Sequence, residues 1–241
     1  MKKLIFLISI LFLFASASAY AALEFDGTND YLEVASAPVS IEPFTMATWY
    51  YSTTSGVPFE PLLALADSAH TGGDDKQIRL IINDIGGQWT ISANSWSTDG
   101  YHRANATAAS SHGVWQHATG VWASQSSRAA YLNGGSKGTD TNLNDNTQVP
   151  NELNIGYGPW SGGTTDKWNG YLAETAIWNV ALTDEEVAIL AKGFSPRFVR
   201  PQNLVFYLPG VRNIQDLRKG VTLIQGGTVS TIAHPRIIYP R

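Results

Sequence analysis

The sequence contains no cysteine, and this absence removes two classes of protein from consideration. Without thiols the chain can form neither a disulfide framework nor a metal site with thiolate ligands. Charged side chains are also scarce, at 15% of the chain, and acids outnumber bases by 20 to 16. Nucleic-acid-binding proteins show the opposite charge balance, so we expect no nucleic-acid partner.

The chain also lacks an apolar run long enough to cross a membrane. Its longest run, from Leu4 to Phe14, has about eleven residues, whereas a spanning helix needs about twenty. Two lysines precede this run and small residues follow it, which is the pattern of a secretory signal peptide. We therefore predict that residues 1–21 are a signal peptide, that the protein is secreted to the periplasm or the extracellular space, and that it has no stable membrane span. Cleavage after Ala19 and retention as an anchor are the alternatives.

What the sequence has in abundance is short apolar runs separated by turn residues, with 22 glycines and 11 prolines. A turn signal roughly every 8–12 residues is typical of an antiparallel sandwich or barrel, so the fold class is all-β. The expected strands are residues 22–26, 30–35, 43–52, 61–66, 77–83, 88–94, 103–108, 115–123, 127–133, 152–157 and 169–179. Glycine and asparagine predict hairpins at NDIGGQW (83–89), YLNGGSKG (131–138) and TSGVP (54–58), and LEFDGTNDYLEV (23–34) is interpreted as the first hairpin.

Only one segment convincingly predicts a helix, at residues 184–192. Thr183 is suited to the N-cap, and Glu186 three residues later completes a capping box. Asp184 lies at the positive end of the helix dipole, and Gly193 ends the helix. We therefore assign the acidic run at its start to capping and not to catalysis.

Five fragments, taken together, resemble laminin-G-like, concanavalin A-like jelly-roll domains with a pentraxin-related architecture. In order, they are LEFDGTNDYLEV (23–34), EPFTMATWYY (42–51), WQHATGVW (115–122) with AAYLNGG (129–135), LNIGYG (153–158) and NGYLAETAIWNVALTDEEVAIL (169–190). The resemblance implies a two-sheet antiparallel jelly-roll sandwich over residues 22–193. Residues 194–241 are then a C-terminal tail with short strands that packs on the sandwich, or alternatively the remnant of a second module.

The resemblance also supplies a test for catalysis. Glucanases of similar architecture carry acids at alternate positions of one strand, because an acid and a nucleophile must flank one glycosidic bond. The tryptophan-rich strands here have no such pair; Glu24 and Asp26 alternate, but they fall at the first loop. The five histidines show no metal-ligand spacing, and no serine lies in a nucleophile-elbow context. We expect no catalytic residues and no enzymatic activity.

The resemblance suggests calcium as the candidate cofactor. In related domains a Ca²⁺ ion often bridges the first loop and an acid of a late strand written G-x-I-D-E-V. That strand here runs from Gly170 to Thr175 with Ala173 at the aspartate position. No cofactor is required by the sequence; a calcium site would use oxygen ligands from the first loop and the late strand: Asp26, Asn29, Asp30 and Glu174.

Aromatic side chains suggest the ligand-binding residues, because exposed rings stack on sugar faces. Four tryptophans lie within strand patterns and are expected in the core: Trp49, Trp115, Trp122 and Trp178. Three other rings lie in polar, glycine-rich contexts and are the candidate ligand-binding residues: Trp160, Trp96 and Tyr101.

The sequence thus predicts a secreted, non-catalytic recognition or adhesion module that binds a glycan or a cell-surface partner. Two alternatives remain open. One is a structural component of a phage fibre or a bacterial surface assembly, with the tail as its docking segment. The other is a glycan-active enzyme with unfamiliar catalytic residues.

Overall fold

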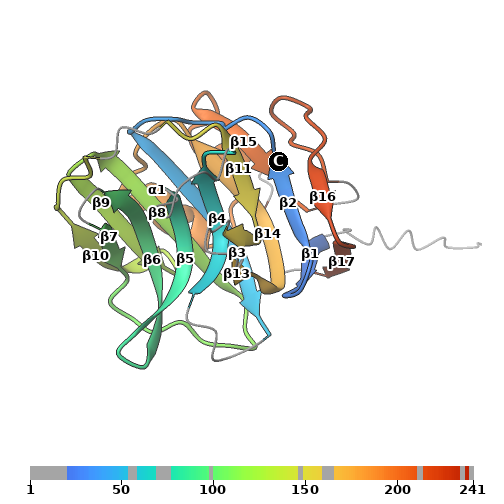
Figure 1. Cartoon of the computed structure of the whole chain (residues 1–241), viewed down its shortest axis with the longest axis horizontal. Coiled ribbons are helices and arrows are strands. Elements are labelled where there is room, and N and C mark those ends of the chain that lie inside the picture. Colours follow the sequence, from blue (N-terminus) through green and yellow to red (C-terminus); the bar gives the residue numbers. More distant parts are fainter. Residues whose placement is uncertain are drawn as a thin grey trace, which may run out of the picture.

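A computed structural model describes residues 21–53, 59–68, 77–97, 100–145, 149–158, 166–210, 214–233 and 237–238. Two antiparallel sheets of eight and seven strands stack face to face, and a two-stranded ribbon accompanies them (Figure 1). The predicted fold class, an all-β jelly-roll sandwich with one short α-helix, is confirmed. Most of the predicted signal peptide and the predicted hairpin at 54–58 lie outside the described residues.

The eight-stranded sheet is built around the long strand β14, which pairs on one side with β3 and on the other with β1 and β15. Its order is β10 (Gly135–Asp140), β9 (Ser127–Leu132), β8 (Gln116–Ser124), β3 (Phe44–Ser52), β14 (Asn169–Trp178), β1 (Ala21–Asp26) and β17 (Ser230–Ala233), with β15 (Leu204–Leu208) beside β14.

The seven-stranded sheet lies opposite the eight-stranded sheet. Its order is β16 (Ile224–Gly226), β2 (Tyr31–Val34), β11 (Glu152–Ile155), β4 (Phe59–Ala66), β5 (Ile78–Ile85), β6 (Gln88–Ser97) and β7 (Gly100–Asn105). The ribbon consists of β12 (Tyr157–Gly158) and β13 (Asp166–Lys167).

The helix α1 (Asp184–Ala191) begins where the capping box predicts. The Thr183 hydroxyl accepts a hydrogen bond from the Glu186 backbone N–H at 3.3 Å, and the Glu186 carboxylate accepts one from the Thr183 N–H at 2.9 Å. A short 3₁₀ helix, η1 (Pro196–Phe198), follows. Val187 and Leu190 pack α1 against the outer face of the eight-stranded sheet. Among the residues that the structure describes, no helix has both the length and the apolar character needed to span a bilayer.

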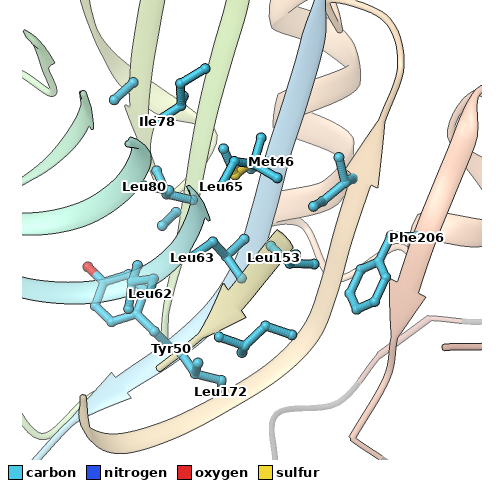
Figure 2. Packing of buried hydrophobic residues seen from close by; sticks show 14 of the residues in the cluster. Met46, Tyr50, Leu62, Leu63, Leu65, Ile78, Leu80, Leu153, Leu172 and Phe206 are labelled. Carbon is cyan, nitrogen blue, oxygen red and sulfur yellow. The ribbon is translucent and has the colours of Figure 1, made fainter. Parts of the chain in front are cut away.

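The core fills the layer between the sheets. Figure 2 shows leucines of the seven-stranded sheet, such as Leu63 and Leu80, facing Met46 and Tyr50 of the other sheet. Trp122 joins the layers by a polar contact as well, because its indole N–H donates to Ser95 Oγ at 3.0 Å across the core. Burial of these side chains is the main force holding the two sheets together.

The chain beyond α1 contributes three strands, each of which pairs with a different strand of the sandwich. β15 pairs with β14, β17 pairs with β1, and β16 pairs with the edge of β2. The Trp178 indole N–H also donates to the Val199 carbonyl at 2.7 Å, which fixes η1 over the sheet. Both sheets therefore contain residues from this last part of the sequence.

Two of the predicted hairpins are confirmed, and one is wrong. Gly86 and Gly87 both have positive φ in the turn between β5 and β6, as do Asn133 and Gly134 between β9 and β10. Residues 23–34, in contrast, do not form a hairpin, because β1 belongs to one sheet and β2 to the other. The loop between them is a corner that carries the chain across the sandwich.

Gly170 is a point where the central strands depend on the absence of a side chain. Its φ is +147°, and a Cβ atom there would overlap the Tyr51 carbonyl oxygen of β3. We expect Gly170→Ala to lower the free energy of unfolding by roughly 3 kcal/mol, from backbone strain and overpacking. Gly135→Ala is the matched control, since nothing lies within 4 Å of that position. Urea unfolding of both variants measures the difference, and equal stability of the two would contradict the prediction.

Candidate functional site

The outer face of the seven-stranded sheet carries an unbroken line of mostly polar side chains. Successive residues of a strand point to opposite faces, and Leu80, Ala93 and Ala104 point into the core. Their neighbours Arg79, Asn94 and Arg103 therefore point outward. The register places six outward residues directly beside one another across six strands, and we call them the polar row: Glu33, Asn154, Ala64, Arg79, Asn94 and Arg103.

Members of the polar row are buried although they face away from the core. Arg79, Asn94 and Asn154 are 2%, 1% and 0% exposed. Within the described part of the chain, Arg79 Nε, Asn94 Oδ1 and Asn154 Oδ1 have no hydrogen-bond partner. Native proteins pair nearly all such atoms, and each unpaired one costs about 1–3 kcal/mol. The polar row thus has hydrogen-bonding capacity that a ligand or ordered water can use.

The β12–β13 ribbon lies over one part of this row. Lys167 Nζ is 4.0 Å from the centre of the Tyr157 ring and 4.1 Å from that of Tyr31, so a cation–π sandwich attaches the ribbon to β2. A Cβ atom on Gly158 would be 3.6 Å from Arg79 Nη1, which places the ribbon directly against the arginine. Burial raises the pKa of Asp166 in the same ribbon, and the nearby Arg79 charge opposes that rise.

Trp96 and Tyr101 form an aromatic pair at the other end of the row. They are directly opposite each other on β6 and β7, and their rings are 4.4 Å apart at an angle of 78°. Two guanidinium groups lie over the Tyr101 ring, Arg79 at 4.9 Å and Arg103 at 5.4 Å from its centre. The structure therefore brings two of the three predicted ligand-binding residues together beside the polar row. Trp160, the third, lies outside the described residues.

The predicted calcium ligands of the first loop lie close together, but their carboxylates are engaged by the backbone. Asp26 Oδ1 accepts the N–H groups of Thr28, Asn29 and Asp30 at 2.8, 3.0 and 3.2 Å. Asp30 accepts the Asp26 N–H at 3.0 Å and the Thr228 N–H at 2.6 Å. The N–H donors lower the pKa of Asp26, the Thr28 N–H most of all, and burial opposes them. These acids shape the corner between the two sheets.

Glu174 is elsewhere. The residue of β14 that pairs with Asp26 is Asn169. Glu174 is five residues further along β14, which is about 16 Å from Asn169 at the usual rise of a strand. Glu174 is 2% exposed, sits at an irregularity of β14 with φ of +53°, and accepts a hydrogen bond from the Tyr207 hydroxyl at 2.7 Å. The four predicted ligands therefore do not converge on one site, and within the described ranges no three His, Asp or Glu side chains gather as a metal site would require.

A second buried polar group lies between the sheets. The Ser52 hydroxyl donates to Glu60 Oε2 at 3.3 Å and lies 2.9 Å from His112 Nδ1. The serine sits between the acid and the histidine, so this is not the order of a catalytic triad, in which the histidine is central. Glu60 is 2% exposed, and burial raises its pKa to about 7 against the opposing hydrogen bond from Ser52.

Sequence reasoning missed the polar row, although a signal was present. Polar residues alternate with apolar ones in three successive strands, as in QIRLIIND, TISANSW and YHRAN. This alternation predicts strands, but it also predicts one polar face shared by all three. The partner from β11, Asn154, could not be found in this way, because its pairing with β4 joins residues far apart in the sequence.

Comparison with known families identifies the superfamily to which this chain belongs. A family model described as the concanavalin A-like lectin/glucanases superfamily, of the laminin-G type, matches residues 26–188, which is more than half of the chain. The chain belongs to this superfamily. A search of curated protein sequences finds no match.

Solved structures with a similar fold agree with this assignment. A heptameric SAP-like pentraxin from Limulus polyphemus is 18% identical, with 90% of this chain and 96% of that chain covered and a TM-score of 0.65. The CBM40 domain of a Ruminococcus gnavus sialidase, bound to α2,3-sialyllactose, is 16% identical, with 70% and 95% covered and a TM-score of 0.54. Domain 4 of an extracellular arabinanase from Geobacillus stearothermophilus, in complex with arabinotriose, is 16% identical, with 71% and 87% covered and a TM-score of 0.54. At these identities the likeness establishes the fold.

The corner loop gives a test of whether Asp26 acts as a hydrogen-bond acceptor or as a metal ligand. We expect Asp26→Ala to lower the free energy of unfolding by about 2 kcal/mol, because three N–H groups lose their acceptor. Asp26→Asn keeps an oxygen acceptor and should lose less than half of that. Thermal unfolding in calcium and in chelator completes the test. A calcium-dependent rise in melting temperature that Asp26→Asn abolishes would instead support the predicted metal site.

Glu60 gives a test of pH dependence. Its pKa is about 7 in the folded protein against 4.5 for the free side chain, so the folded protein holds the proton more tightly. The contribution of Glu60 to stability is therefore greatest below pH 4.5 and falls as the pH rises to about 7, by at most about 3 kcal/mol. Glu60→Gln cannot ionise and should remove this fall. Urea unfolding of both proteins between pH 4.5 and 7.5 measures it, and identical pH slopes would show that Glu60 is not the cause.

Proposed function

We propose that this protein is a secreted, non-catalytic carbohydrate-recognition module whose ligand lies on the polar row beside Trp96 and Tyr101. The observation that carries the proposal is the set of buried, unpaired polar atoms next to an aromatic pair. Sugar-binding sites combine these two elements, because ring faces contact the apolar faces of a sugar while fixed polar groups bind its hydroxyls.

The two guanidinium groups specify the ligand further. Arg79 and Arg103 flank the Tyr101 ring, and the Nε atoms of both are buried without a partner among the described residues. Guanidinium groups bind carboxylates through paired, charge-assisted hydrogen bonds. A sugar that carries a carboxylate, such as sialic acid or a uronic acid, fits this end of the row. The structurally similar CBM40 domain bound to sialyllactose supports the choice.

Secretion is part of the proposal and rests on the basic and apolar segment at residues 1–21. A processed N-terminus can be read directly by sequencing the protein recovered from the medium or the periplasm. An intact N-terminus in the cytoplasmic fraction would contradict secretion and leave the ligand site unaffected.

One observation favours a second candidate, a glycan-active enzyme. Glu33 of β2 and Glu152 of β11 point to the same outer face at diagonal positions, because Glu33 is directly opposite Asn154. Diagonal neighbours have Cβ atoms roughly 7–8 Å apart, and two carboxyl groups at such a separation can flank a glycosidic bond. Release of reducing ends from acidic polysaccharides, lost in Glu152→Gln, would establish the enzyme in place of the binding module.

Binding measurements test the proposed site. We expect the mature protein to bind sialyllactose or an oligogalacturonide more tightly than lactose, by isothermal titration calorimetry. Trp96→Ala and Arg103→Gln should each weaken that binding by about tenfold or more, equivalent to about 1.4 kcal/mol. Phe198→Ala, an exposed ring on η1, is the matched control and should bind as the unaltered protein does. Equal affinity for sialyllactose and lactose, with both weakened alike by Trp96→Ala, would refute the role of the arginines, and no binding to either would refute the site.

A further inference from the structure

Aromatic side chains also gather on the opposite surface of the molecule, the outer face of the eight-stranded sheet. Trp49 and Trp115 were expected in the core, and this expectation is wrong: both are partly exposed, whereas Trp122 and Trp178 are fully buried. The reason is the alternation of the strand. Tyr50 enters the core, as Met46 does, so the neighbours of Tyr50 on either side, Trp49 and Tyr51, face outward.

Three of these outward rings touch one another, and we call them the aromatic cluster: Tyr51, Trp115 and Tyr171. The ring centres are 5.2 Å apart for Tyr51 and Tyr171, 5.8 Å for Tyr51 and Trp115, and 6.2 Å for Trp115 and Tyr171. Tyr51 and Tyr171 are directly opposite on β3 and β14. All three rings are half-buried, so each keeps part of its surface in solvent.

A polar hollow of about 450 Å³ adjoins the cluster, and Tyr171 belongs to both. The register continues from Tyr171 to Glu24 of β1 and then to Ser230 of β17, which form its floor. The corner loop and the start of β14 contribute the other polar groups, among them Asp26, Asn29 and Asn169. The hollow has the volume of a ligand site for one or two sugar rings.

The chemistry of the hollow separates it from the polar row. Its lining includes three acids, Glu24, Asp26 and Asp30, and no basic residue. An anionic ligand would therefore be repelled. Asp26 uses Oδ1 for its backbone contacts, and Asn169 uses Oδ1 to accept the Thr53 hydroxyl at 2.6 Å. Asp26 Oδ2 and the Asn169 amide N–H₂ remain for hydroxyl groups, which both donate and accept hydrogen bonds.

We propose that this face is a second carbohydrate-binding site, specific for neutral sugars. A pyranose ring stacks on the exposed part of the aromatic cluster, and its hydroxyl groups bind the carboxylate and amide groups of the hollow. The site is independent of the polar row, since it lies on the other sheet and uses none of the same residues. Binding one neutral and one acidic sugar at the same time follows from this arrangement.

The experiment uses the full mature chain and a panel of neutral hexasaccharides: β-1,4-glucan, β-1,4-xylan, α-1,5-arabinan and α-mannan. We expect at least one of them to bind in calorimetric titration. Trp115→Ala and Tyr171→Ala should each weaken that binding at least tenfold and leave sialyllactose binding unchanged. Asn29→Ala changes only an exposed loop side chain of the hollow and should weaken it severalfold, which keeps the test valid where a ring variant fails to fold. Phe198→Ala is the control that should retain neutral-sugar binding.

Different outcomes separate this proposal from the previous one. Binding of sialyllactose without binding of any neutral hexasaccharide would overturn the second site alone. Loss of sialyllactose binding in Tyr171→Ala, with the fold intact by circular dichroism, would show that the two faces are not independent and would also overturn it. Light scattering tests a different occupant: a dimer that Trp115→Ala converts to a monomer, with sugar binding unaltered, would make the face an interface between copies of this chain.

Discussion

The central strands of the sandwich send alternate side chains into the layer between the sheets, and this constraint decides which of their other residues face outward. Once Leu80, Ala93 and Ala104 enter the core, Arg79, Asn94 and Arg103 must face outward on three adjacent strands. Once Tyr50 enters the core from the other sheet, Tyr51 must face outward beside Tyr171. The two outer surfaces are thus consequences of how the interior is packed. A register slip of one residue in a central strand would exchange that strand's inward and outward side chains.

The two outer surfaces differ in chemistry because different elements cover them. The outer face of the eight-stranded sheet is partly covered by α1, which removes Trp178 from solvent, and the aromatic cluster occupies an uncovered part. The seven-stranded sheet has no helix among its described neighbours, and the β12–β13 ribbon and its cation–π contacts with Lys167 cover part of the polar row instead. Two arginines lie beside the rings on the outer face of the seven-stranded sheet, whereas the hollow beside the rings of the eight-stranded sheet is lined, among the described residues, by three acids and no basic residue. The two proposed sites rest on this difference in charge between the surfaces.

The sequence predicted those features that depend on neighbouring residues. The α1 capping box and the glycine turns at 86–87 and 133–134 involve contacts over a few positions, and local chemistry was sufficient. The choice of core face in β3 was not predictable in this way, since Trp49, Tyr50 and Tyr51 are all aromatic and either alternation would bury rings. The corner at Asp26 resembled a hairpin because its turn chemistry is the same, and only strand partners more than a hundred residues away show that β1 and β2 lie in different sheets. The position of Glu174 depends on Tyr207 of the tail, which no local pattern relates to it.

The placement of β1 has a consequence for when the fold can be completed. This first strand is paired on both sides, with β14 and with β17, and its Asp30 corner is held by the backbone of Thr228. Its partners are synthesised about 150 and 200 residues later, so the contacts that complete the eight-stranded sheet must close long loops. The eight-stranded sheet therefore becomes complete only after residues 230–233 have been synthesised and have paired with β1.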